Sequence, residues 1–172
     1  MSHAHSTMSV YREAVLEHLF VGELLRYLWV SGPVRAEVMK PRVDDAGYDV
    51  VIESNRVLRH IQLKASFHGA KTARQKVNRE LANKPSGCIV WILFDTKTMN
   101  LGPFLYFGSE PGEPLPTLES FPVARHSKGN AKGHKAKRPG IHVVPKAKFR
   151  ELQTIEELAA TLFGPIPVDR LN

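Results

Sequence analysis

The sequence predicts a mixed α/β fold with a central sheet flanked by helices. An apolar helix at residues 10–30 precedes three short extended segments, and a polar helix at 70–84 then leads into a continuous apolar strand at 88–94. The chain has 172 residues, of which 42% are hydrophobic and 24% charged. This size and composition are typical of one folded domain, which we expect to span residues 1–172.

Apolar residues that recur at spacings of three and four predict the first helix. Leu16, Phe20, Leu24 and Leu28 mark this stripe, and Ser31-Gly32-Pro33 ends it. The helix is apolar around most of its circumference, so we expect it to pack against a sheet. Glu13 and Glu17 are interpreted as residues of its solvent-exposed face.

Three extended segments come next, at residues 34–43, 48–53 and 57–64. The turn residues Asp44-Asp45-Ala46-Gly47 separate the first two, and Ser54-Asn55 separates the second from the third. The helix predicted at 70–84 is rich in charge and ends at Pro85-Ser86-Gly87. Residues 88–94 are β-branched and aromatic, which indicates a strand buried on both faces.

The C-terminal half, residues 96–172, is predicted to extend this core. An aromatic patch at 104–107 adds a short strand, residues 141–144 form a last edge strand, and residues 154–163 form a helix. Between them, residues 124–139 contain Gly, Lys, His and Asn with little to bury, which predicts an exposed basic loop.

The positive charge of the chain is concentrated in that loop. Lys and Arg number 24 against 17 Asp and Glu, which gives a net charge of +7. Residues 124–139 hold six of these cations and no acid, so the rest of the chain carries only +1. Such a local cluster predicts a binding site for an anionic partner.

Several protein classes are excluded by composition. Cys88 is the only cysteine, so the chain has no internal disulfide and no thiolate zinc cluster, and its apolar surroundings indicate a buried hydrophobe. No apolar run is long enough to span a membrane, and residues 1–9 lack the apolar core of a signal peptide. We therefore expect a cytoplasmic protein with no membrane partner.

Side-chain alternation brings three polar residues together. If the second and third extended segments pair through Ser54-Asn55, Asp49 lies beside Gln62 and Lys64, which share one face of their strand. A carboxylate, an amide oxygen and an ammonium group would then converge at the end of a sheet. These groups suit a divalent cation held by oxygen, with a lysine that stabilises negative charge or positions a water.

These residues resemble a known nuclease motif. Gly47-Tyr48-Asp49 followed by Ile61-Gln62-Leu63-Lys64 is similar to the core of the PD-(D/E)XK superfamily, in particular its Mrr-like and Holliday-junction-resolvase-like branches. The predicted order αβββαβ over residues 10–95 matches the restriction-endonuclease-like core of that superfamily. Gly22-Glu23 matches the acid that commonly joins the site from the first helix. Gln62 replaces the commoner acid, and no proline precedes Gly47.

The resemblance implies a metal-dependent endonuclease that hydrolyses phosphodiester bonds, with DNA expected ahead of RNA. Asp49, Gln62, Glu23 and the Leu63 carbonyl would hold Mg²⁺ or Mn²⁺. Lys64 would orient the attacking water and stabilise the phosphate in the transition state. Many nucleases dimerise to cut two strands, so the resemblance also leaves room for a homodimer.

Basic residues in two segments are candidate nucleic-acid contacts. They are Lys71, Arg74, Lys76, Arg125, Lys128, Lys132, Lys135, Lys137 and Arg138. Two other functions stay open beside the nuclease. Since Gln62 removes one negative ligand, the same fold could bind nucleic acid without catalysis. Alternatively, the chain is a protein-interaction domain whose basic loop docks an acidic partner.

Overall fold

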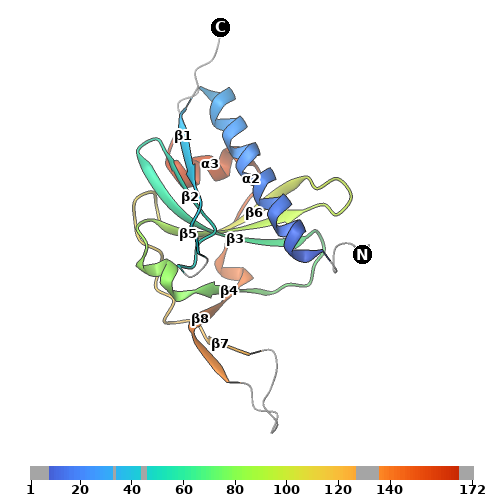
Figure 1. The fold of residues 1–172 in the computed structure, drawn as a ribbon, viewed down its shortest axis with the longest axis vertical. Helices are drawn as coiled ribbons and strands as arrows, with labels where there is room; N and C mark the ends of the chain where they lie inside the picture. The colour runs from blue at the N-terminus through green and yellow to red at the C-terminus, as the bar shows by residue number, and fades with distance from the viewer. Residues whose placement is uncertain (1–7, 33, 44–45, 127–135, 167–172) are drawn as a thin grey trace.

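The computed structural model describes residues 8–32, 34–43, 46–126 and 136–166. Within them, the protein is an α/β protein with a mixed six-stranded sheet, a small antiparallel sheet and two helices (Figure 1). The elements are α2 (Ser9–Ser31), β1 (Ala36–Met39), β2 (Val50–Ser54), β3 (Val57–Phe67), β4 (Arg74–Asn78), the 3-10 helix η1 (Arg79–Asn83), β5 (Gly87–Phe94), β6 (Leu101–Gly108), β7 (Val123–Arg125), β8 (Lys137–Pro145), the 3-10 helix η2 (Lys146–Lys148), β9 (Arg150–Leu152) and α3 (Ile155–Phe163).

The main sheet has the strand order β1-β2-β3-β5-β6-β9. Strands β1, β2 and β3 form an antiparallel meander, β5 runs parallel to β3, and β6 and β9 continue antiparallel. The three predicted extended segments and the buried strand at 88–94 are confirmed. The first of them is shorter than expected, and the third continues to Phe67.

One face of the main sheet carries both helices. Phe20 and Leu24 of α2 and Leu162 of α3 are fully buried in a single core with Ile61 of β3 and Val90 of β5. The predicted helices at 10–30 and 154–163 are both confirmed. The expectation of helices on both sides of the sheet is wrong, because α2 and α3 share this core.

The opposite face is covered by the small sheet, whose strand order is β4-β8-β7, together with η1 (Figure 1). The helix predicted at 70–84 is therefore wrong, since this segment forms β4 and η1. Its only large apolar residues are Val77 and Leu81, a spacing that suits a helix. In the fold, Val77 pairs with His142 of β8 and packs in a second core with Leu81 and Trp91. This distant strand pairing overrides the local helical pattern.

The ends of the predicted basic loop are also ordered strands. Arg125 of β7 pairs with Lys137 of β8, and the two strands form a hairpin; residues 127–135 of its connection lie outside the described residues. Figure 1 shows the hairpin reaching beyond the main sheet. The strand expected at 141–144 is the second half of β8. It is not an edge strand, because β8 lies between β4 and β7.

Neither α2 nor α3, the two α-helices in the described part of the chain, combines the length and apolar character that crossing a membrane requires.

Candidate functional site

The candidate site lies where β3 extends past the start of β2. Strand β2 pairs with β3 only between Val50↔Ile61 and Ser54↔Val57. Among the described residues, no strand pairs with residues 62–67 of β3 on that side, although β5 pairs with the same stretch on the other side. Backbone groups along this half-edge of β3 are thus accessible to side chains and ligands.

Asp49, the residue just before β2, is held by β3 through two hydrogen bonds. Its backbone N–H donates to the Ile61 carbonyl at 2.9 Å, and its Oδ2 accepts from the Leu63 N–H at 2.6 Å. The paired register ends at Val50↔Ile61, and the bond from the Asp49 N–H to the same Ile61 carbonyl sets Asp49 across from Ile61 and not in register with Gln62. The N–H and C=O of one strand residue point to the same side, so the Leu63 carbonyl also faces the half-edge.

Gln62 is directed into the protein, and only 8% of its surface is exposed. Its Oε1 is buried and has no hydrogen-bond partner among the described residues. A buried acceptor without a donor costs about 1–3 kcal/mol. Such groups call for an explanation in a native fold, and a bound cation or water is a standard one.

A cavity of about 500 Å³ adjoins this half-edge, and we call it the β3-edge cavity. Asp49, Leu63 and Lys64 line it, with Gln75 of β4 and the first turns of α2 completing the wall. Lys64 is half-buried. The structure therefore brings Asp49, Leu63 and Lys64 to one cavity, and Gln62 is not among the residues that line it.

Glu23 is not among the residues that line the β3-edge cavity, whereas Glu13 and Glu17 are. Glu17 precedes Glu23 by about 9 Å along the axis of α2. Its side chain is only 19% exposed and forms an ion pair with Lys40. The interpretation of Glu17 as a solvent-exposed face residue is wrong. The sequence carried a signal for it, because Glu17 directly follows Leu16 and precedes Phe20 by three positions, on the buried stripe.

Glu23 has a different environment. Burial raises the pKa of Glu23 above its ordinary value, and the positive charge of Arg26 partly opposes this rise. The carboxylate is thus placed where it is poorly solvated, away from the residues that line the cavity.

The oxygen donors at this site suit a hard cation. Within the described residues, no three His, Cys, Asp or Glu side chains gather closely enough to hold a metal by themselves. A cation here would need the Asp49 carboxylate together with neutral oxygens, namely Gln62 Oε1 and the Leu63 carbonyl. Mg²⁺ and Mn²⁺ accept such mixed oxygen sets, with waters completing the shell. Asp49 and Leu63 supply oxygens at the cavity that suit such an ion, and the buried Gln62 oxygen on the same strand has no donor among the described residues.

The predicted nucleic-acid contacts fall into two groups. Lys71 and the β4 residues Arg74 and Lys76 are exposed, and β4 reaches the β3-edge cavity through Gln75. The remaining described ones, Arg125, Lys137 and Arg138, are exposed on the β7–β8 hairpin, and Lys128, Lys132 and Lys135 lie outside the described residues. Arg74 pairs with Pro145, eight residues along β8 from Lys137. The two groups therefore lie toward opposite ends of β8.

No known family model, curated protein or solved structure matches this chain.

Proposed function

We propose that the protein is a metal-dependent phosphodiesterase that cleaves DNA at the β3-edge cavity. One observation carries the proposal: Asp49, Leu63 and Lys64 line one cavity at an unpaired half-edge of the sheet, and Gln62, the residue before Leu63, holds a buried oxygen without a hydrogen-bond partner among the described residues. This donor set with an adjacent lysine is the chemistry that metal-assisted phosphodiester hydrolysis needs.

The order of elements supports the restriction-endonuclease-like resemblance. Helix α2, the meander of β1, β2 and β3, and the parallel strand β5 follow one another as the αβββαβ core requires. The crossover between β3 and β5 departs from that core, since it consists of β4 and η1 in place of a helix. Asp49, Gln62 and Lys64 all lie before this crossover, so the departure leaves their placement unchanged.

The roles follow from chemistry. A bound Mg²⁺ would neutralise charge on the phosphate oxygens and lower the pKa of a coordinated water. Asp49, Gln62 and Leu63 would hold the cation, in place of a set that includes Glu23. Lys64 would orient the attacking water and stabilise the negative charge that grows on the phosphate. Glu17 adds an acid to the same cavity, paired with Lys40.

Exposed cations on β4 would position the DNA substrate beside the β3-edge cavity. Arg74 and Lys76 project from the outer face of β4, while Gln75 between them faces the cavity. Residues two apart on a strand share a face, so the two cations form a pair about 7 Å apart. This pair suits adjacent phosphates of a strand that passes the cavity, and such contacts position a backbone without reading its bases.

A second candidate function is nucleic-acid binding without catalysis. The ion pair between Glu17 and Lys40 favours it, because this acid is already neutralised by a lysine. Asp49 and the neutral Gln62 then leave the cavity with a weaker cation site than two free carboxylates would form.

Nicking of supercoiled DNA in the presence of Mg²⁺ tests the proposal. Asp49→Asn and Lys64→Met should each reduce the nicking rate at least a hundredfold and leave DNA binding within a few-fold of wild type. Lys97→Met is a matched control, because Lys97 is an exposed lysine in the turn between β5 and β6. Unchanged nicking in Lys64→Met would refute the proposed role of this lysine. Salt-sensitive DNA binding by a wild-type protein that never nicks would favour the binding module.

A further inference from the structure

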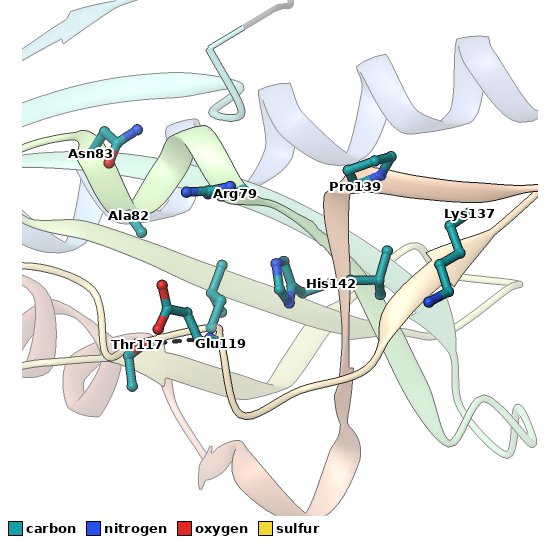
Figure 2. Close-up of a pocket in the computed structure, with 10 residues that line it drawn as sticks. Arg79, Ala82, Asn83, Thr117, Glu119, Lys137, Pro139 and His142 are labelled. Carbon is teal, nitrogen blue, oxygen red and sulfur yellow. Dashed lines mark hydrogen bonds between the residues drawn. The ribbon is translucent and has the colours of Figure 1, made fainter.

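A cavity of about 420 Å³ lies at the base of the β7–β8 hairpin, where η1, residues 117–119 and β8 line it (Figure 2). Figure 2 shows its two cations on opposite sides of His142, with Arg79 toward the Glu119 end and Lys137 at the other. Because these charges do not converge, we assign no ligand to this cavity. The outer edge of the main sheet, at β1, has a more coherent pattern.

Strand β1 ends the main sheet, and among the described residues only β2 pairs with it. Its outer edge thus presents unpaired backbone N–H and C=O groups, to which a further strand can bond. Figure 1 shows β1 at a margin of the sheet, beside the C-terminal end of α2. The side chains around this edge decide which partner it takes.

Apolar side chains continue from the β1 edge onto α2. Trp29 is 73% exposed, and it lines a cavity of about 630 Å³ together with Leu25, Val34 and Ala36. Val38 follows Ala36 by two positions, so it lies on the same face of β1, and it is also exposed. We call these five residues the β1-edge patch. An exposed tryptophan within an apolar patch of this kind is typical of a protein interface.

The other face of β1 carries charges that are poorly compensated within the chain. Glu37 lies directly opposite Glu53 of β2, and like charges in this position destabilise a sheet. Arg35 forms an ion pair with Glu37, but the two atoms are 3.9 Å apart and both side chains are largely exposed, so the pair contributes little. A second cation beside Glu37 would therefore stabilise this edge.

We propose that β1 pairs antiparallel with β1 of a second copy of this chain, about a two-fold axis at Ala36. In this register, Arg35 lies opposite Glu37 of the partner subunit, and by symmetry the contact forms twice. Ala36 belongs to the β1-edge patch, so the two patches meet at the axis. The dimer thus joins the two main sheets into one continuous sheet and covers Trp29 of both copies.

The charges select this register over its neighbours. An axis at Glu37 would oppose Glu37 to itself, and an axis at Val38 would oppose Glu37 to Met39. An unrelated extended peptide could bond to the backbone of β1, whereas a second copy supplies both the matching cation and a matching apolar patch. We therefore assign a second copy as the occupant of this edge. The assignment does not rest on DNA cleavage at the β3-edge cavity.

Sedimentation velocity of the full chain over a concentration series tests the proposal, and we expect a monomer–dimer equilibrium. Trp29→Glu should weaken dimerisation about tenfold or more, because it places a charge in the apolar centre of the interface. Its fold should be unchanged, which circular dichroism checks, since Trp29 is mostly exposed in the monomer. Val10→Glu is a matched control at an exposed position of the same helix, about 28 Å away, and should dimerise like wild type.

Tryptophan fluorescence gives a second readout of the same contact. The chain has two tryptophans, and Trp91 is buried, so quenching by acrylamide reports chiefly on Trp29. Quenching should decrease as the protein concentration rises in wild type, because the dimer covers Trp29. It should decrease in the same way in Val10→Glu.

Reversal of charge tests the register. Glu37→Arg places two arginines opposite each other across the axis and should weaken dimerisation about tenfold or more. It also removes the repulsion from Glu53, so the dilute monomer should be at least as stable in urea as wild type, which separates loss of the dimer from loss of the fold. Adding Arg35→Glu restores opposite charges and should return the dimer affinity to within a few-fold of wild type. The proposal is overturned if wild type stays monomeric up to its solubility limit, or if Glu37→Arg dimerises like wild type.

Discussion

Asp49 and Leu63 are joined by a 2.6 Å hydrogen bond, in which the Leu63 backbone N–H donates to a carboxylate oxygen. The side chain of Asp49 thus takes the place of the strand that would otherwise pair with this part of β3. A carboxylate with this structural role is also the strongest oxygen ligand proposed for the β3-edge cavity, so its two roles must be separated by experiment.

Asp49→Asn and Asp49→Ala should separate them. The amide oxygen of asparagine can still accept from the Leu63 N–H, so Asp49→Asn should cost less than about 1 kcal/mol of unfolding free energy. Alanine leaves that N–H without its acceptor, and Asp49→Ala should cost about 1–3 kcal/mol. Urea denaturation measures both. Nicking should be lost equally in the two variants, and an Asp49→Asn protein that nicks like wild type would show that the carboxylate is purely structural.

Substitutions at Gln62 test a structural role against a metal-binding role in the same way, because its buried Oε1 has no partner among the described residues. Gln62→Glu adds a negative charge to the proposed cation site, so Mg²⁺ or Mn²⁺ should bind at least tenfold more tightly by calorimetry. Gln62→Met removes the orphaned oxygen in a side chain of similar length. It should be as stable as wild type or more stable, and its cation binding should be weaker. Equal cation affinity in all three proteins would argue against Gln62 as a ligand.

Local patterns were sufficient to predict α2, which packs into one core, and β5, which is buried on both faces. The spacing of Leu16, Phe20 and Leu24 predicts α2, and the apolar run from Cys88 to Phe94 predicts β5. Alternation along two adjacent strands predicts Asp49 beside Gln62 and Lys64, and the structure places Asp49 and Lys64 at one cavity. These inferences depend on residues close together in the chain.

The features that sequence reasoning missed depend on distant partners. Strand β4 exists because Val77 pairs with His142, which lies 65 residues later in β8, a strand whose first residues the sequence predicts as loop. Glu17 was missed for another reason. An acid on the buried stripe of a helix reaches solvent only where the sheet beneath the helix ends. Glu17 lines the β3-edge cavity because β2 begins only at Val50, and this boundary depends on strand pairing in the folded sheet.

Glu23 should matter for stability and not for activity. Burial raises the pKa of Glu23, with Arg26 in partial opposition. A raised folded-state pKa contributes stability that is fully present below the unfolded value of 4.5 and lost as the pH rises through the folded value. Glu23→Gln should therefore be slightly more stable than wild type at pH 7, by about 0.5 kcal/mol or less at this partly solvated position.

Urea denaturation at pH 7 and pH 4 measures this difference, which should shrink at the lower pH. Nicking by Glu23→Gln should match wild type, whereas Glu17→Gln should weaken Mg²⁺ binding because Glu17 lines the β3-edge cavity. If Glu23→Gln abolished nicking and Glu17→Gln left Mg²⁺ binding unchanged, the cation site would have to include Glu23 as the resemblance implied.

Cys88 should report on unfolding, because burial raises its pKa to about 12 and the thiol is fully buried in the core. Arg59 lowers the pKa of Cys88 by a smaller amount. A protonated, inaccessible thiol does not react with Ellman's reagent, so the native protein should react only at the rate at which it opens. The unfolded protein in guanidinium should react at once. Immediate reaction of one thiol in the native state would contradict this placement of Cys88.

The raised pKa of Cys88 also makes the stability of the protein depend on pH in the alkaline range. The folded-state pKa of Cys88 lies above the ordinary value of 9.0, so the associated stability is fully present below pH 9 and is lost as the pH rises toward 12. Cys88→Ala lacks a thiol to ionise and should be less stable than wild type at pH 7 because of the cavity it leaves. The stability difference between the two proteins should narrow above pH 9 in urea denaturation. A difference that stays constant up to pH 10.5 would mean that the thiol ionises equally in the folded and unfolded chains.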